Sequence, residues 1–478
     1  MNERTLIANL KEKIGEEITL KGWVDIRRDH GKLIFIDMRD QSGKVQMVAL
    51  PNHEEAHDSA SKLRPEWVIE VKGKVNPRPE KMVNKDEANG MLEIEMLSVT
   101  VLNESETPPI DLRGDGREIG EDVRLKYRYL DLRRPRLQKN IRLRHDVMLY
   151  IRNFLSKERF IEIETPLLSK STPEGARDFL VPSRIEPGKF FALPQSPQQY
   201  KQLLMVAGFE RYFQFARCLR DEDSRGDRQP EFTQLDIEMS FVDREDVMDV
   251  NERLLIALVK ELAPHKKIQV IPFPRMSYKE AMEKYGTDKP DLRLDKSDPD
   301  LLAFCWVIDF PFFEKTDPSA GSGQASGWTF THNPFSAPKP EHMEWLMQGS
   351  AGEHIGEILT TQYDVALNGF EIGGGSVRNH TPLALKRVFE IMGHKEESIN
   401  AKFGHMLEAF SFGAPPHGGI AWGLDRLMAI LQNEPNIREV IAFAKNGEGK
   451  DLMMSAPSDV SPEQLTELGL RVVKGKGG

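Results

Sequence analysis

Short runs of alternating apolar and polar residues fill the first hundred residues of the chain. Because turn-forming glycine, asparagine and aspartate residues separate them, these runs predict five β-strands, at residues 18–24, 32–40, 45–50, 67–75 and 92–96. Five short strands in about a hundred residues are typical of a small closed Greek-key barrel of the OB type. Barrels of this type bind single-stranded nucleic acid, so residues 1–108 are predicted to form a nucleic-acid-binding domain.

Basic and aromatic side chains on these strands are the candidate contacts for nucleic acid. Arg27, Arg28 and Arg78 are basic, and Phe35 and Gln46 offer stacking and hydrogen bonding to bases. From the residues alone, a barrel without this function fits the pattern equally well. Phe35 would then belong to the core, and the arginines would lie in solvent.

The composition changes after residue 108, and residues 109–139 are predicted to be a linker rich in proline, glycine and basic residues. Beyond the linker, apolar residues recur four positions apart from Val147 to Leu155, which predicts an amphipathic helix over residues 140–160. This helix leads into a strand that ends at Pro166.

Two further alternating runs flank a charged turn and predict a long hairpin over residues 212–241. Arg220, Glu222 and Arg228 lie on or near its polar face, and Gly226 supplies a turn position. A fixed guanidinium charge with paired donors suits a polyanion such as a nucleotide phosphate. Taken alone, the same residues also fit a solvated, salt-bridged loop.

Three other segments carry candidate site residues. A helix N-cap is predicted at Ser196, because proline follows it, and the helix would present Lys201. Residues 364–378 are predicted to be one strand with carboxylates towards its two ends. Residues 418–423 predict a glycine-rich strand that turns into an apolar helix, with Arg426 in its first turns.

Charge and cysteine content limit the class of protein. A net charge of -10 argues against a protein that coats nucleic acid generally, although it allows a local basic patch. The two cysteines, Cys218 and Cys305, form no CxxC pair, which favours a reducing compartment. The N-terminus lacks the apolar core of a signal peptide, and no apolar run is long enough to span a membrane. We therefore expect a cytoplasmic protein with no membrane partner.

No P-loop and no Rossmann glycine fingerprint is present, so ATP binding would need arginines on an antiparallel sheet. Residues 147–166, 212–241 and 418–431 resemble motifs 1, 2 and 3 of the class II aminoacyl-tRNA synthetases. Six segments are similar to the bacterial type of the aspartyl-tRNA synthetase family: RDED, DRQPEFTQLDIE, TPEGARDF, LPQSPQQYKQLL, GFEIGGGSVR and GLDRL. The resemblance runs from the barrel to about Val473. It implies an α+β fold, in which an OB-fold anticodon-binding barrel precedes a class II catalytic domain, residues 140–478, with an antiparallel sheet flanked by helices.

The resemblance also implies sites for L-aspartate, ATP, Mg²⁺ and tRNA. Arg220, Glu371 and Arg426 would act in catalysis. The aspartate pocket would comprise Glu174, Ser196, Gln198, Lys201, Arg220, Asp236, His332 and Arg378. The ATP site would comprise Arg220, Asp221, Glu222, Arg228, Gln229, Phe232, Glu371, Gly423, Leu424, Asp425 and Arg426. Asp364 and Glu371 would bind Mg²⁺, and the anticodon would contact Arg28, His30, Phe35, Gln46, Arg78 and Glu93.

Two of the implied roles decide which amino acid the resemblance points to. Lys201 and Arg378 would hold the side-chain carboxylate of aspartate. They would reject asparagine, because a neutral amide leaves both charges unpaired. For the same reason an asparaginyl or lysyl type fits less well. A non-catalytic RNA-binding relative is expected to lose Arg220, Glu371 or Arg426, and a free-standing amide-forming ligase would have no anticodon for its barrel to bind.

The chain departs from the family pattern in two places. The bacterial type usually carries an inserted domain of about a hundred residues after the KPDLR segment, but here only twelve residues separate Arg293 from Trp306. Because the matched site residues all lie outside this insertion, we expect near-normal charging. His30 resembles the form that charges both tRNA(Asp) and tRNA(Asn), whereas Lys81 does not, and we favour the form that charges both. The motif 1 segment ending at Pro166 implies a homodimer.

Overall fold

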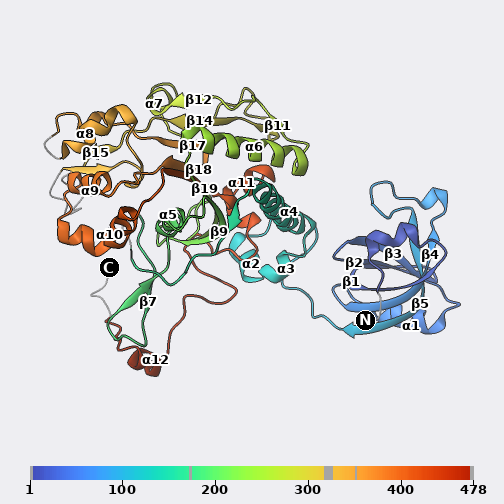
Figure 1. Cartoon of the computed structure of the whole chain (residues 1–478). Helices are drawn as coiled ribbons and strands as arrows, with labels where there is room; N and C mark the ends of the chain where they lie inside the picture. The colour runs from blue at the N-terminus through green and yellow to red at the C-terminus, as the bar shows by residue number, and fades with distance from the viewer. Residues whose placement is uncertain (1–3, 172–174, 317–326, 350–351, 474–478) are drawn as a thin grey trace. The chain divides into compact units, whose positions relative to one another are not determined.

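The structure is a computed structural model that describes residues 4–171, 175–316, 327–349 and 352–473. The chain divides into two compact units, residues 1–113 and 114–478, and each is considered by itself (Figure 1). The division falls inside the segment predicted as a linker, and the part of that segment after Arg113 belongs to the second unit.

The first unit is a closed five-stranded barrel, as predicted. Its strands are β1 Glu17–His30, β2 Leu33–Asp40, β3 Gly43–Ala49, β4 Val68–Pro77 and β5 Leu92–Asn103, in the order β1-β2-β3-β5-β4. Helix α1 Glu54–Lys62 connects β3 to β4. Alternate residues such as Leu20, Ile36 and Ile94 are buried in the barrel core. Their neighbours point outward, as the alternating pattern requires.

An eight-stranded, mainly antiparallel sheet forms the centre of the second unit. In spatial order its strands are β12 Arg275–Ser277, β14 Phe304–Ile308, β17 Gln362–Leu367, β18 Phe370–Val377, β19 His417–Gly423, β10 Glu231–Ser240, β9 Arg211–Leu219 and β6 Ile161–Glu162. The edge pairs β12–β14 and β6–β9 are parallel. The predicted hairpin is the β9–β10 pair, in which Glu231 lies opposite Leu219.

Helices cover one face of this sheet. Helices α4 Pro135–Lys157, α6 Arg244–Leu262 and α11 Leu424–Leu431 share one apolar core with the buried strand residues. Leu235, Ile237 and Met239 of β10 enter that core, so Asp236 and Glu238 between them must point to the opposite face. The opposite face is met by helix α5 Gln198–Val206. A second apolar core joins α9 Pro382–Ile391 and α10 Glu396–Ser411, on the left of the larger unit in Figure 1.

Smaller elements complete the second unit. Three two-stranded sheets are formed by β7 Leu180–Pro182 with β8 Phe190–Ala192, β11 Lys267–Ile268 with β13 Leu301–Leu302, and β15 Phe313–Lys315 with β16 Trp328–Phe330. The short α-helices are α2 Glu121–Lys126, α3 Arg128–Asp131, α7 Tyr278–Tyr285, α8 Met343–Met347 and α12 Pro462–Glu467. Turns of 3-10 helix lie at Pro340–His342, Ile355–Glu357 and Ile437–Val440 in this unit, and at Ile7–Glu12 and Glu80–Met82 in the first unit.

Residues 364–378 are not one strand, as predicted, but most of a hairpin of β17 and β18. The turn at Asn368 and Gly369 has φ values of 52° and 87°. Asparagine followed by glycine favours this two-residue turn, because both positions need positive φ. The turn was missed because alternating apolar residues continue on both sides of it, as they would in one strand. Its consequence is that the two carboxylates lie on paired strands rather than at opposite ends of one.

Two further predictions were wrong in detail. Helix α5 begins at Gln198, so Pro197 rather than Ser196 is the cap position, and Ser196 Oγ instead accepts a 3.4 Å hydrogen bond from the Gln198 amide. The basic run from Arg124 to Pro135, predicted as part of a linker, includes the end of α2, all of α3 and the start of α4, and Arg124 and Arg128 are buried. Among the described residues, no helix has the length and apolar character needed to cross a membrane.

Candidate active site

Two rows of side chains form the floor of the candidate site on the sheet face opposite α4, α6 and α11. Cross-strand pairing aligns Asp236, Ala421, Gly374 and Asp364 in one row. It aligns Glu238, Gly419, Ser376 and Gln362 in the other. Carboxylates from β10 and β17 thus border a floor of small residues, which leaves space above the sheet for a ligand.

Glycine is required at two floor positions by close approach. A side chain at Gly419 would clash with the Glu238 carboxylate and the Ile237 carbonyl. A Cβ at Gly374 would lie 2.7 Å from Asp364 Oδ1 and 3.5 Å from Glu371 Oε1. The same point in space is therefore close to both carboxylates, which places them together above Gly374.

A buried cluster of two cations and two carboxylates lies at one end of the floor. Lys201 Nζ is 3.0 Å from Asp236 Oδ1 and 3.4 Å from Glu238 Oε2. Arg378 donates from Nε and Nη2 to Glu238 at 2.8 and 3.1 Å. It also donates from Nη1 to Ser376 Oγ at 2.9 Å. All four charged side chains are at most 2 % exposed, so each depends on the others for its charge compensation.

The pKa values of the two carboxyl groups in this cluster are shifted in opposite directions. Burial raises the pKa of Asp236 above its ordinary value, although Lys201 acts against this. Burial would also raise the pKa of Glu238, but Arg378 and Lys201 outweigh it, and the pKa is lowered. Glu238 is therefore held firmly as an anion by its bidentate arginine, whereas Asp236 is the less well compensated of the two.

Two polar atoms beside the cluster lack hydrogen-bond partners among the described residues. They are Asp236 Oδ2 and Gln198 Nε2, both buried. Buried polar atoms are nearly always paired in folded proteins, so an acceptor and a donor left together suggest a ligand with groups of both kinds. Gln198 lies in the first turn of α5, one helical turn before Lys201. Ser196 is partly exposed just before the helix.

The second acidic group of the floor is the pair Asp364 and Glu371. Burial, and next the neighbouring Glu371 carboxylate, raise the pKa of Asp364 well above its ordinary value. A cation between the two would relieve this repulsion. Over the described ranges no three His, Cys, Asp or Glu side chains gather to hold a metal alone. Two carboxylates nevertheless fit Mg²⁺, which is often held by one or two carboxylates together with substrate phosphates.

The charged turn between β9 and β10, residues 220–230, brings together the predicted residues for ATP. The Arg220 guanidinium lies 5.1 Å from the centre of the Phe232 ring, and its Nε donates to the Gln195 carbonyl at 3.4 Å. Arg228 faces Glu222 at 3.6 Å. The Arg228 and Glu222 side chains are 48% and 38% exposed, so they remain accessible to a ligand. Asp221 is also in the turn, and its amide donates to the Arg177 carbonyl at 3.0 Å.

Gln229 and Arg426 are held by contacts from elsewhere in the chain. Gln229 is buried and accepts a 2.8 Å hydrogen bond from the Lys445 amide, and its Nε2 has no partner among the described residues. Arg426 lies 3.3 Å from Asp227 of the charged turn and donates to the Glu371 carbonyl. Arg426 is thus joined to both the charged turn and the acidic pair.

The three residues before Arg426 occupy different positions. Gly423 is partly exposed at the end of β19, and Leu424 is fully buried in the core. The two Asp425 carboxylate oxygens accept hydrogen bonds from Arg144 of α4 and, at 3.0 Å, from the Thr233 amide of β10. These contacts tie α4, β10 and α11 together, so Leu424 and Asp425 support the site from below rather than facing it.

Two predicted residues remain, Glu174 and His332. Glu174 lies outside the described residues. His332 is exposed, and its ring packs edge-on against Phe310 with the ring centres 4.8 Å apart. The sequence prediction missed three contacts: Glu238, Ser376 and Asp227. Glu238 was detectable in principle, because it lies two residues after Asp236 on the same face of β10.

The barrel has a cavity of its own, about 660 Å³ in volume. It is lined by five of the six barrel residues predicted to contact the anticodon: Arg28, His30, Phe35, Gln46 and Arg78. Glu93 lies on β5 and is not part of the lining. Arg78 Nε is buried without a partner among the described residues. Met82, Asn84 and Glu87 of the β4–β5 connection also line the cavity and were not predicted.

Comparison with known proteins identifies the family. Residues 120–447 match the model of tRNA synthetases class II (D, K and N). The chain belongs to this family. Residues 18–102 match the OB-fold nucleic acid binding domain. The OB-fold barrel and the class II catalytic fold predicted from the sequence are confirmed, and ligases of this family use ATP.

Two class II relatives are similar to this chain over nearly the whole length of both sequences. The aspartate--tRNA(Asp) ligase of Deinococcus radiodurans is 40% identical, with 99% of each chain covered. The aspartate--tRNA(Asp/Asn) ligase of Rubrobacter xylanophilus is also 40% identical, over 95% of this chain and 94% of the relative. The Deinococcus comparison extends over 591 positions, although this chain has 478 residues. The length difference fits the predicted loss of an inserted domain.

Solved class II structures share the fold at lower identity. The asparaginyl-tRNA synthetase of Pyrococcus horikoshii, complexed with asparaginyl-adenylate, superposes with a TM-score of 0.72 at 23% identity. It covers 93% of this chain and 98% of that one. The aspartyl-tRNA synthetase of Entamoeba histolytica has a TM-score of 0.71 at 22% identity, with 93% and 92% covered.

Proposed function

We propose that the protein is an aspartate–tRNA ligase. It would activate L-aspartate with ATP and then transfer the aspartyl group to the 3′ end of tRNA(Asp). Full-length similarity to aspartate--tRNA ligases supports this function. The observation that carries the choice of amino acid is the pair of buried cations, Lys201 and Arg378, beside a buried acceptor that lacks a partner among the described residues.

The charge balance of the pocket explains why aspartate fits. Lys201 and Arg378 offset Asp236 and Glu238, so the four groups together carry no net charge. An amino acid with an ammonium and a side-chain carboxylate preserves this balance. The ammonium would bind Asp236 Oδ2 together with Ser196 and Gln198, and the carboxylate would bind Lys201 and Arg378. Asparagine would bring the ammonium without the side-chain carboxylate and would therefore upset this balance.

Activation would occur at the charged turn. An α-carboxylate oxygen of aspartate attacks the α-phosphorus of ATP, and the bond to the leaving pyrophosphate breaks. Arg220 would bind both the α-carboxylate and the α-phosphate and stabilise the charge that develops there. Phe232 would stack on adenine, beside Glu222 and Gln229. Arg228 and Arg426 would hold the γ-phosphate, and Gly423 would leave the approach to Arg426 open.

Asp364 and Glu371 would hold Mg²⁺, which would neutralise phosphate charge. In the second step, a hydroxyl of the terminal tRNA ribose attacks the aspartyl carbonyl, and AMP leaves. Asp221, Glu174 and His332 are proposed to border the pocket.

The experiment that tests the function is ATP–pyrophosphate exchange driven by L-aspartate. Because tRNA and ATP meet in the cytoplasm, we infer a cytoplasmic location.

Anticodon binding is assigned to the barrel cavity. Phe35 would stack on a base, and Arg28, His30, Gln46 and Arg78 would bind base edges, with Glu93 at the rim. Replacing Arg78 with alanine removes the buried donor that lacks a partner among the described residues. Charging of tRNA(Asp) should fall about tenfold to hundredfold, because a base-edge hydrogen bond from arginine is worth roughly 1–3 kcal/mol. Pyrophosphate exchange should be unchanged.

The matched control is Arg64→Ala, because Arg64 is exposed on the barrel and does not line the cavity. Equal losses in the two variants would contradict the assignment. His30 lines the cavity, whereas Lys81 does not. We therefore also propose that tRNA(Asn) is charged, and purified tRNA(Asn) that accepts no aspartate would exclude this.

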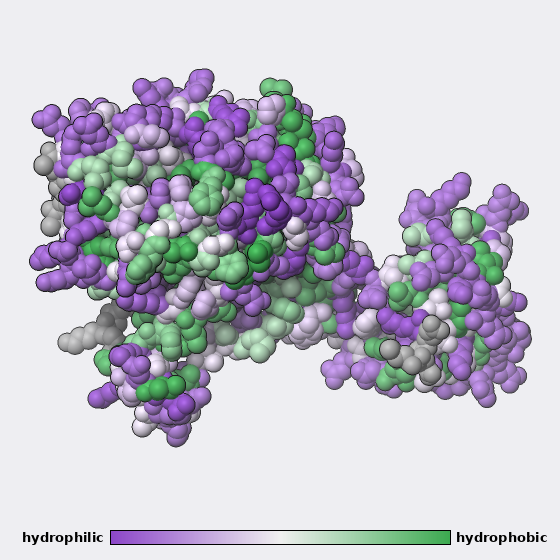
Figure 2. All heavy atoms as spheres, viewed as in Figure 1, coloured by the Kyte–Doolittle hydropathy of each residue, from purple (hydrophilic) through white to green (hydrophobic). Residues whose placement is uncertain are grey.

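A homodimer is proposed from the apolar surface of the motif 1 region. Strand β6 is at the edge of the sheet, and Ile161 within it is 50% exposed. Leu149, Leu167 and Leu168 are also exposed. Hydrophobic residues gather on the lower half of the viewed face of the second unit (Figure 2). Light scattering should give the dimer mass for the wild type and the monomer mass for Ile161→Glu. A wild-type monomer would contradict the proposal.

A further inference from the structure

The segment after α11, residues 434–446, connects two parts of the second unit that are distant in sequence. On one side it contacts residues 114–139, the part of the predicted linker that belongs to the second unit, which we call the linker region. On the other side it contacts the charged turn, residues 220–230. We refer to residues 434–446 as the bridging segment, and its contacts on each side are given in turn.

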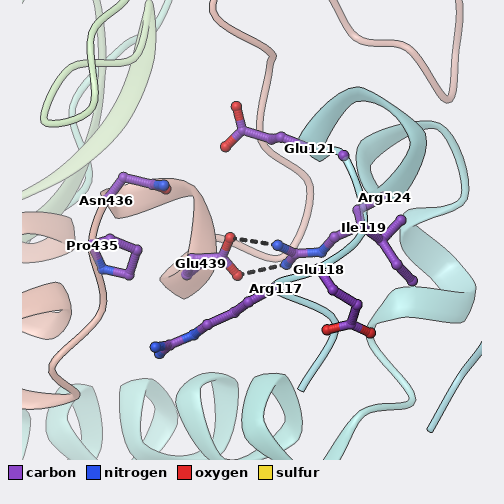
Figure 3. A pocket seen from close by; sticks show the side chains of 9 residues that line it. Arg117, Glu118, Ile119, Glu121, Arg124, Pro435, Asn436 and Glu439 are labelled. Atoms are coloured by element: carbon purple, nitrogen blue, oxygen red, sulfur yellow. Dashed lines mark hydrogen bonds and ion pairs between the residues drawn. The ribbon is translucent and has the colours of Figure 1, made fainter. Parts of the chain in front are cut away.

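Buried ion pairs join the bridging segment to the linker region. Arg124 donates to both carboxylate oxygens of Glu439 at 3.0 and 2.7 Å, and Arg136 donates to Glu434 at 2.7 Å. Figure 3 shows Arg124 and Glu439 pointing toward one another beside a cavity of about 370 Å³, with Glu121 extending from α2 at its edge. Bidentate pairs of this kind fix orientation as well as distance.

Backbone contacts join the bridging segment to the charged turn. The Ile437 amide donates to the Gly226 carbonyl at 3.0 Å. The Lys445 amide donates to Gln229 Oε1 at 2.8 Å. The bridging segment therefore lies against the second half of the charged turn, on both sides of Arg228 in the sequence.

Arg438 is the one side chain in these contacts that reaches both sides. Its Nε donates to Glu121 Oε1 of α2 at 2.6 Å, and its Nη1 donates to the Arg225 carbonyl at 3.1 Å. Its own carbonyl accepts a 2.7 Å hydrogen bond from Arg128. The Arg438 side chain is only 12% exposed. A single guanidinium thus links the linker region to the charged turn.

The backbone of Arg225 is hydrogen-bonded to that of Arg228. The two residues exchange backbone hydrogen bonds of 3.2 Å in each direction, so they close the turn. Asp227 between them is 3.3 Å from Arg426. A shift of the Arg225 carbonyl would move Arg228 directly and would move Arg426 through Asp227.

We propose that Arg438 is a positioning residue for ATP binding, which holds the charged turn against the linker region so that Arg228 and Arg426 can bind the terminal phosphates together. This inference rests on the proposed function. Arg438 does not itself contact substrate. Its loss affects the nucleotide half of the site and leaves the aspartate half, around Lys201 and Arg378, in place.

The test is ATP–pyrophosphate exchange with the full chain carrying Arg438→Met, which removes both contacts and keeps the apolar stem. The KM for ATP should rise about tenfold or more, because hydrogen bonds to charged groups contribute roughly 1.5–3 kcal/mol. The kcat at saturating ATP and the KM for aspartate should change less than about twofold. Arg438→Lys keeps the positive charge but lacks the planar guanidinium with its several donors, so it should give an intermediate KM for ATP.

Glu121→Ala removes only the contact with α2 and should give a smaller rise in the same direction. It also tests the proposal if Arg438→Met does not fold. The matched control is Arg253→Met, because Arg253 also forms two ion pairs, with Glu158 and Asp249, away from the site. An unchanged KM for ATP in folded variants, or an equal rise in the KM for aspartate, would overturn the inference. A wild type without aspartate-dependent exchange would instead overturn the proposed function.

Discussion

Replacing Arg378 with methionine is expected to raise the KM for aspartate by at least about a hundredfold while the KM for ATP stays near that of the wild type. Arg378 is 2 % exposed and uses its guanidinium fork on Glu238 and Ser376. Its removal would leave Glu238 buried with only Lys201 for compensation, at a distance of 3.4 Å. Breaking such a buried pair costs roughly 3–5 kcal/mol of stability, so the loss of aspartate binding should be accompanied by a lower melting temperature.

Arg378→Lys separates the two effects of this substitution. Lysine retains the charge, so the protein should be more stable than Arg378→Met. It lacks the planar fork, however, so the ligand carboxylate would lose its oriented donor. The measurement is pyrophosphate exchange at varied aspartate, with thermal unfolding of each variant. An unchanged KM for aspartate in Arg378→Lys together with a normal KM in Arg378→Met would show that Arg378 serves the fold alone.

Replacing Arg220 with alanine should lower the kcat of exchange by about a thousandfold, because a guanidinium on the reacting phosphate is worth roughly 10³–10⁵ in rate. The fold should tolerate the change. The Arg220 side chain makes a long hydrogen bond to the Gln195 carbonyl and a cation–π contact with Phe232, and these are worth only about 1–2 kcal/mol together. The prediction therefore combines a large loss of rate with nearly normal stability.

Arg217→Ala is the matched control for Arg220→Ala. Arg217 lies on β9, three residues before Arg220 in the sequence, and is exposed, and it contacts Thr233 and Glu231 rather than the site. Its removal should leave kcat within about twofold of the wild type. If both variants lost activity equally, the effect would come from the β9–β10 hairpin as a whole, and the role assigned to Arg220 would be contradicted.

The alternating pattern predicted much of the fold because the barrel strands alternate between buried and outward-facing residues. The five barrel strands and the β9–β10 hairpin follow directly from this periodicity. The turn at Asn368 and Gly369 was missed, since apolar residues continue on both sides of it. Asparagine followed by glycine was nevertheless a usable turn signal. Recognising it would have predicted that Asp364 and Glu371 meet on neighbouring strands.

The buried charges were harder to predict. The arginines after residue 120 have the composition of a solvated linker, yet Arg124 and Arg128 are buried against Glu439 and Asp131. Glu439, the partner of Arg124, lies more than three hundred residues away in sequence, and no local pattern indicates such a pairing. The role of Glu238 was missed for a related reason, because a carboxylate on a strand is usually solvated unless a distant cation meets it.

The central claim is that the pocket bordered by Lys201 and Arg378 selects aspartate. The most direct measurement is ATP–pyrophosphate exchange by the full chain, compared among L-aspartate, L-asparagine and L-lysine at equal concentration. The account predicts exchange with aspartate at a near-normal rate despite the missing inserted domain. It predicts exchange with asparagine and lysine at least about a hundredfold slower, since asparagine lacks the carboxylate that balances its ammonium and lysine adds a second positive charge. Exchange that is undetectable with aspartate, or equally fast with asparagine, would contradict it.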